Sequence, residues 1–111
     1  MATYLVLYLS SQSAQEQMAS TSPEQGQEGM EEWTRWGESA GSSLVDFGKP
    51  LAFAFAVPDA SGPRQGLHVG GYSIMQAGSA DELRRILEGH PHRKAPGAVI
   101  EVHEALELPG M

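Results

Sequence analysis

The sequence predicts an α+β fold of the ferredoxin-like type, in which one antiparallel sheet carries both helices on the same face. Two observations predict it. The expected elements follow the order β-α-β-β-α-β, and the first apolar run, Tyr4–Leu9, contains only aromatic and aliphatic residues. Such a run is typical of a strand that is buried on both faces. With 111 residues the chain has the size of one domain, so residues 1–111 are expected to fold as a single unit.

The first predicted helix has clear signals at both ends. Residues 10–21 are rich in serine and glutamine without any period, which predicts a loop. Ser22 then has the character of an N-cap, Pro23 suits the first helical position, and Gln25 can complete a capping box. Gly41 is the expected end of this helix.

The apolar side of this helix carries both tryptophans of the chain. Met30, Trp33, Trp36 and Ala40 fall within one narrow stripe, opposite a face of charged residues. Together with Tyr72, the two tryptophans could form the wall of a pocket for a flat ligand. Aromatic residues at helical spacing are also typical of an ordinary core.

A hairpin is expected in the middle of the chain. Residues 44–47 predict a short strand, and residues 51–57 alternate large and small apolar side chains as a strand does. The turn-forming residues 58–63 would connect this strand to residues 67–77 as an antiparallel hairpin. A pair of glycines, Gly70-Gly71, predicts a bulge in the second arm.

The last third of the chain predicts a strand, a helix and a final strand. Ser79 and Glu82 form the pattern of a capping box, and Gly89 is the expected end of the helix. Residues 98–104 predict the last strand, and residues 105–111 form a tail.

Composition limits the partners. Fourteen acidic residues against seven basic ones, a net charge of −7, exclude nucleic acid as a natural partner. The absence of cysteine excludes thiolate chemistry and disulfides. Residues 4–9 are too short to span a membrane, so a cytoplasmic protein without membrane contact is expected. The uncovered face of the sheet should be apolar, and pairing of two sheets in a homodimer would cover it.

Several short motifs occur in an order that characterises a known family. After the first strand and the helix with two tryptophans come Gly41, Leu44–Leu51, Gly71–Ile74, Gly89–His92 and Val99–Val102. With these motifs the chain resembles the YCII-related family, which belongs to the dimeric α+β barrel class. The resemblance implies a small-molecule enzyme or binding protein. In some members a histidine and an aspartate are the proposed acid-base groups, but the helix position of that histidine holds Met30–Trp33 here.

Two residues are the candidate acid-base groups of this chain. Asp46 lies in an apolar stretch, where a carboxylate is costly unless it is paired or exposed, and a raised pKa would suit proton transfer. The alternative role is a turn residue that caps the backbone at Gly48. His90 follows the C-terminal glycine of the second helix and could transfer protons or bind an anion. Its alternative role is interaction with the helix dipole.

The expected function is a small-molecule enzyme that uses metal-free acid-base chemistry. Asp46 and His90 are its predicted catalytic residues, and Trp33, Trp36 and Tyr72 its predicted substrate-binding residues. A non-catalytic ligand-binding or regulatory dimer and a purely structural interaction module are the alternatives.

No metal or other cofactor is expected. His90 and His92, even with Glu101 or His103, do not match a recognised ligand spacing. His92 is the weaker of the two candidates for chemistry, because Arg93 follows it in what the sequence predicts to be a solvated loop.

Overall fold

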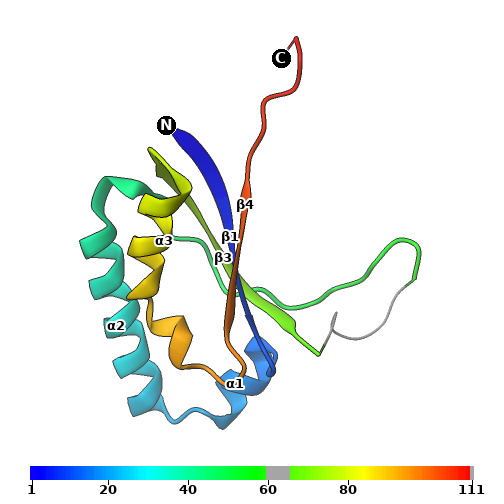
Figure 1. Cartoon of the computed structure of the whole chain (residues 1–111). Helices are drawn as coiled ribbons and strands as arrows, with labels where there is room; N and C mark the ends of the chain where they lie inside the picture. The colour runs from blue at the N-terminus through cyan, green and yellow to red at the C-terminus, as the bar shows by residue number, and fades with distance from the viewer. Residues whose placement is uncertain (60–65, 111) are drawn as a thin grey trace.

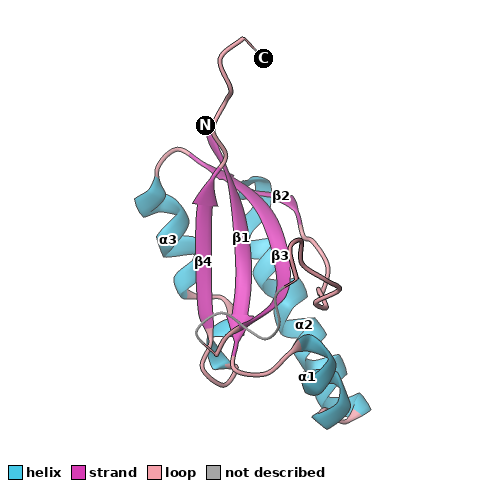
Figure 2. Ribbon diagram, turned by 90° about the vertical axis from the view of Figure 1, so that its right-hand side faces the viewer, coloured by secondary structure: helices cyan, strands magenta, loops and turns pink. Residues whose placement is uncertain are grey.

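The computed structural model describes residues 1–59 and 66–110, and within them the chain forms an α+β domain (Figure 1). A four-stranded antiparallel sheet has helices on one face, and the described residues place no helix on the other (Figure 2). The strands are β1 (Ala2–Ser10), β2 (Leu44–Asp46), β3 (His68–Ala77) and β4 (Val99–Glu104). The helices are α1 (Ala14–Ser20), α2 (Pro23–Ala40) and α3 (Ala80–Glu88), with short 3₁₀ turns at Gly41–Ser43 and Pro91–Lys94.

The sheet has the strand order β2-β3-β1-β4, and β1 therefore lies in its interior. Along β1 the side chains of Tyr4, Val6 and Tyr8 are buried on the side of the helices. Leu5 points to the other face and is 40% exposed. In the single chain Leu5 is thus exposed and Leu7 half-buried, so complete burial of both faces of β1 remains a prediction that depends on a second copy.

The helix ends agree with the sequence signals. Ser22 Oγ accepts a hydrogen bond from the N–H of Gln25, whose side chain accepts one from the N–H of Ser22. Gly41 caps the end of α2 at φ 58°, a conformation in which glycine is favoured. Ser79 Oγ accepts a hydrogen bond from the N–H of Glu82 at the start of α3. The Glu82 side chain accepts from the N–H of Gly78 instead of that of Ser79, so only the first half of the predicted capping box forms.

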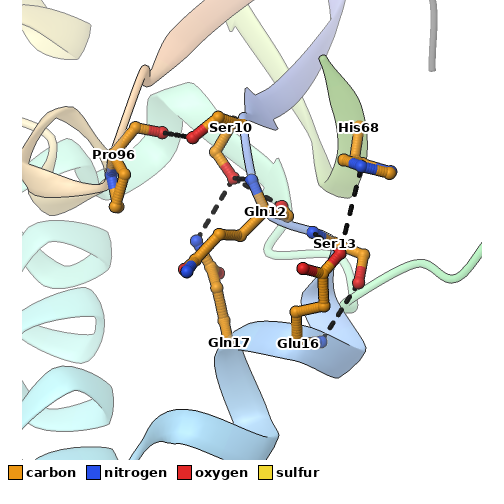
Figure 3. Close-up of polar contacts among 8 residues, drawn as sticks. Ser10, Gln12, Ser13, Glu16, Gln17, His68 and Pro96 are labelled. Atoms are coloured by element: carbon orange, nitrogen blue, oxygen red, sulfur yellow. Dashed lines mark hydrogen bonds and ion pairs between the residues drawn. The ribbon is translucent and has the colours of Figure 1, made fainter. Parts of the chain in front are cut away.

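The prediction that residues 10–21 form a loop is wrong, since they contain α1. Ser13 and Glu16 form a complete capping box. This pattern is visible in the sequence and indicates the start of a helix, although the composition of the segment is typical of a loop. Gln17 donates a hydrogen bond from Nε2 to Ser10 Oγ at 3.2 Å, and Glu16 lies 4.0 Å from the ring of His68 (Figure 3). These contacts place α1 beside the ends of β1 and β3.

The prediction that residues 51–57 form a strand is also wrong. Pro50 bridges to Gly71, and the N–H of Leu51 donates to the carbonyl of Gly70. A longer hairpin would need partners before Gly70, but β3 begins only two residues earlier, at His68. Residues 51–59, which we call the arm, project instead from the side of the sheet opposite the helices (Figure 1).

The arm exposes large apolar side chains. The exposed fractions of Phe53, Phe55 and Val57 are 69%, 77% and 86%. The turn predicted at residues 58–63 falls largely outside the described residues. The predicted bulge is confirmed: Tyr8 pairs with Gly71 and Leu9 with Val69, which leaves Gly70 as the extra residue.

The loop after β2 is held close to β3 by a glycine. Gly48 has φ +83°, and a Cβ placed there would lie 1.7 Å from the carbonyl oxygen of Tyr72. No residue with a side chain can adopt this approach without moving the backbone. The tail after β4 has no regular structure over residues 105–108, and no helix in the described residues is long and apolar enough to cross a membrane.

Candidate functional site

A cavity of about 400 Å³ lies between α1, the first half of α2 and the ends of β1 and β3. We call it the apolar cavity, because most of its lining is apolar. Its large apolar side chains are Met18, Met30, Trp33 and Phe47. Its polar side chains come from Tyr8, Ser10, Gln17, Thr21, Lys49, Tyr72 and His92.

Two helical glycines make room for this cavity. Gly26 and Gly29 of α2 line it, and each costs the helix roughly 1 kcal/mol relative to alanine. A Cβ at Gly29 would meet no atom within 4 Å, and one at Gly26 would meet only Thr21, at 3.8 Å. The missing side chains therefore leave open space instead of allowing close packing.

An aromatic cluster separates the apolar cavity from the region between α2 and α3. The ring of His90 lies 4.1 Å from Trp36, 4.4 Å from Trp33 and 4.7 Å from Tyr8, measured between ring centroids. His90 is only 2% exposed. The histidine that the sequence singles out is thus a buried member of the layer between sheet and helices.

Hydrogen bonding defines the tautomer of His90. Its Nδ1 accepts a hydrogen bond of 2.9 Å from the N–H of His92. The proton of the neutral ring must then be on Nε2, an atom with no hydrogen-bond partner among the described residues. Burial, with a smaller effect of His92, lowers the pKa of His90 from 6.5 to about 3, so the ring is neutral near pH 7.

His92 lines the apolar cavity, whereas His90 does not. Its ring Nε2 lies 2.7 Å from the carbonyl oxygen of Leu9 and donates to it. Burial lowers the pKa of His92, and hydrogen bonding to the carbonyls of Leu9 and Val99 opposes that shift. Sequence reasoning placed His92 in a solvated loop, whereas Pro91 begins a 3₁₀ turn that directs it inward.

A chain of hydroxyl groups connects the cavity wall to the loop after β2. Tyr8 donates from its hydroxyl to Ser73 Oγ at 2.8 Å, and Ser73 donates to the carbonyl of Phe47 at 2.6 Å. Burial raises the pKa of Tyr8 to about 12, more than the bond to Ser73 lowers it. Tyr8 therefore remains a protonated donor and cannot act as a base near neutral pH.

Asp46 is placed apart from His90. It stands opposite Ile74 in the sheet, whose neighbours Ser73 and Met75 are fully buried on the helix side. Asp46 is exposed, and its Oδ1 accepts a hydrogen bond of 2.9 Å from the N–H of Gly48. This is the turn role that was the alternative to catalysis. The two predicted catalytic residues make no contact in the described part of the chain.

The three predicted substrate-binding residues divide between two cavities. Trp33 and Tyr72 line the apolar cavity. Trp36 does not, and its Nε1–H donates to the carbonyl of Ile86 at 3.2 Å. It contributes instead to a second, more open cavity of about 900 Å³ between α2 and α3, which we call the interhelical cleft.

Residues 1–59 and 66–110 contain no group of three or more histidine, aspartate or glutamate side chains that could hold a metal ion. Comparison of the sequence with protein-family models gives no match, and comparison with curated proteins gives none either.

Proposed function

We propose that the protein binds a small, largely apolar molecule in the apolar cavity. The observation that carries this proposal is the pair of helical glycines that line a cavity of about 400 Å³. This volume is within the range of roughly 300–1,000 Å³ that is usual for small-molecule sites. Glycine at position 29 destabilises α2 relative to alanine and leaves open space in the cavity. Binding of a ligand in that space would explain why a glycine stands there.

The lining indicates the kind of ligand. Trp33, Phe47 and Met30 offer aromatic and thioether surface, which suits a flat apolar body. Gln17 and Lys49 supply hydrogen-bond donors in the same lining, and no described lining residue is acidic. We therefore favour a planar apolar molecule with one neutral or anionic polar end.

Acid-base catalysis by His92 is the second candidate. It is supported by the position of His92 in the cavity wall and by a lowered pKa, which leaves its ring neutral near pH 7. The original pair, Asp46 with His90, receives less support, because the first caps a turn and the second is enclosed by rings. Binding without catalysis is the simpler account of the lining.

The architecture supports the family proposal. The order β2-β3-β1-β4, with all pairs antiparallel, is the order expected of a ferredoxin-like sheet. We propose on this basis that the chain is a YCII-related protein of the dimeric α+β barrel class.

A homodimer is the proposed assembly. The face of the sheet opposite the helices carries Leu5 and Leu7, paired with Ile74 and Tyr72 of β3. The arm projects from the same side of the sheet (Figure 1). A second copy placed on this face would cover both the sheet and the apolar side chains of the arm.

The two tryptophans allow a direct test of ligand binding. Naphthalene-2-sulfonate serves as the probe, and the indole N–H signals of Trp33 and Trp36 are followed by NMR. Because Trp33 lines the apolar cavity and Trp36 does not, saturable shifts are expected at Trp33 and small ones at Trp36. Gly29→Leu should weaken binding at least tenfold by filling the cavity, without loss of helix stability.

The control variant is Thr34→Leu, at an exposed position of α2 that lines neither of these cavities. It should bind the probe as the original chain does. Equal binding by Gly29→Leu, or equal shifts at both tryptophans, would contradict the proposed site.

The catalytic alternative has its own test. Hydrolysis of 4-nitrophenyl acetate is measured for the original chain and for His92→Gln. Catalysis by His92 predicts hydrolysis above the rate in buffer and its loss in the variant. If the original chain and His92→Gln hydrolyse the ester at the same slow rate and both bind the probe, catalysis by His92 is contradicted and the binding function is supported.

A further inference from the structure

The interhelical cleft collects most of the positive charge of an acidic protein. Four of the seven lysines and arginines of the chain line it: Arg35, Arg85, Arg93 and Lys94. Only two carboxylates, Glu32 and Glu88, are in the same lining. The cleft thus has an excess of cations in a chain that has twice as many acidic as basic residues.

Most of these cations lack a carboxylate partner. Lys94 is paired with Glu32 at 2.7 Å. Within the described residues, Arg35, Arg85 and Arg93 form no ion pair with an acidic side chain. Three guanidinium groups therefore retain hydrogen-bond donors that are free for an external anion.

Backbone hydrogen bonds hold two of the guanidinium groups at the cleft. Arg85 donates from Nε to the carbonyl of Asp81, and Arg93 donates from Nη1 to the carbonyl of Glu88. Each bond uses only one of the five N–H donors of an arginine. These bonds fix the position of Arg85 on α3 and of Arg93 in the 3₁₀ turn after it, and most of their N–H donors remain available for a ligand.

The dipole of α3 accounts for only part of this arrangement. Cations near a helix C-terminus are favourable, and this suits Arg85 and Arg93. Arg35 belongs to α2, more than one turn before the end of that helix, and the last turn of α2 contains no basic residue. The charge of Arg35 helps, after that of Lys94, to lower the pKa of Glu32, so Arg35 is a cation of the opposite wall that no helix dipole accounts for.

The cleft also contains an unsatisfied buried donor. His90 is 2% exposed, lines the cleft, and has no hydrogen-bond partner at Nε2 within the described ranges. The bond between the His92 N–H and Nδ1 puts the proton of the neutral ring on Nε2. A buried donor without a partner destabilises the folded chain, and an anion that reaches Nε2 would supply the missing acceptor.

We propose that the interhelical cleft binds the phosphate group of a small molecule, with Arg35, Arg85 and Arg93 as its ligands. Three unpaired guanidinium groups match a dianion with several acceptor oxygens better than a monocarboxylate. The site is separate from the apolar cavity, since none of these three arginines lines the apolar cavity. The proposal therefore does not depend on the function proposed for that cavity.

Calorimetric titration with inorganic phosphate, at constant ionic strength set with chloride, tests the site. Saturable one-to-one binding is expected for the original chain. Arg85→Gln and Arg93→Gln should each raise Kd at least tenfold. The matched control is Arg84→Gln, because Arg84 is on the same helix as Arg85 but does not line the cleft. The Kd of this variant should change less than twofold.

Three outcomes would overturn the proposal. They are an equal loss of affinity in Arg84→Gln, binding of acetate as tight as that of phosphate, and no saturable binding at all. Vesicles containing phosphatidylglycerol distinguish a lipid headgroup from a free phosphate. The net charge of −7 predicts no vesicle binding, and vesicle binding without response to free phosphate would also contradict the site.

Discussion

At the scale of single residues, His90 is the most constrained titratable group. Its ring contacts Tyr8, Trp33 and Trp36 and accepts a hydrogen bond from His92, an arrangement that requires the neutral form. Protonation would put a charge among aromatic side chains and remove the acceptor at Nδ1. Protonation of His90 should therefore lower the stability of the folded protein in acid.

We expect the free energy of unfolding to decrease as the pH falls below 6.5. The pKa of His90 is about 3 in the folded protein and near 6.5 when the chain is unfolded. Between these values the unfolded state binds more protons, so stability is complete above pH 6.5 and is lost as the pH falls toward 3. The slope for one group is at most about 1.4 kcal/mol per pH unit. Urea denaturation at pH 7, 6, 5 and 4 measures it.

His90→Asn is the comparison for this measurement. Asparagine can keep an acceptor for the N–H of His92 but does not titrate. The variant should be less stable at pH 7, because it leaves a gap among the rings, and should show a shallower dependence on pH. An unchanged slope would mean that other groups, His92 among them, cause the sensitivity to acid.

Residue types alone did not determine which polar side chains lie in a cavity. The apolar neighbours of Asp46 predict a buried carboxylate, yet Asp46 is exposed on an edge strand and caps a turn. The register between β2 and β3 shifts between Leu44 and Asp46. Such a shift changes the face of the sheet on which a side chain lies, and the local sequence does not predict it. Trp33 and Trp36 belong to the same helical stripe, yet only Trp33 lines the apolar cavity, so its predicted role in binding remains a prediction.

At the scale of elements, the loop after β2 depends on one glycine. Gly48 has a positive φ and approaches the carbonyl of Tyr72 too closely for any Cβ. Gly48→Ala should therefore destabilise the protein by about 2 kcal/mol or more, from backbone strain together with the displaced loop.

Gly41→Ala is the matched control. Gly41 also has a positive φ, +58°, but a Cβ there would meet no atom within 4 Å. Gly41 has ψ −129°, so the cost of its alanine variant should be backbone strain alone, about 1–3 kcal/mol. Urea denaturation of both variants separates the two contributions. Equal losses would show that contact with Tyr72 does not matter.

The elements with strong local signals were predictable, and those without were not. The caps of α2 and α3 and the bulge at Gly70 follow from short patterns. The arm alternates large and small side chains as a strand does, but β3 begins too late in the chain to pair with its whole length. The alternation alone does not show whether a partner strand is present. In α1 the capping box was present, and composition masked it.

At the scale of the whole molecule, the uncovered sheet face and the arm lead to one prediction. Sedimentation at micromolar concentration should show a dimer for the original chain. Phe53→Ser with Phe55→Ser should shift the equilibrium toward monomer at least tenfold, because two exposed apolar side chains leave the proposed interface.

The tail supplies the control. Leu106→Ser with Leu108→Ser also removes two exposed apolar side chains, and it should leave the dimer unchanged. A monomeric original chain would contradict the proposed assembly. A dimer insensitive to the arm variant would restrict the interface to the sheet face.

The arm also has a consequence for colloidal behaviour. Residues 51–57 are seven apolar residues with strand alternation and no charge, the type of segment that can add to other strands and form fibres. Lys49 and Pro50 precede this segment, and Pro58 and Asp59 follow it. Charge and proline on each side are the features that limit strand addition at sheet edges. The chain thus exposes an aggregation-prone sequence between two pairs of gatekeeper residues, and replacing those pairs should favour the formation of fibres.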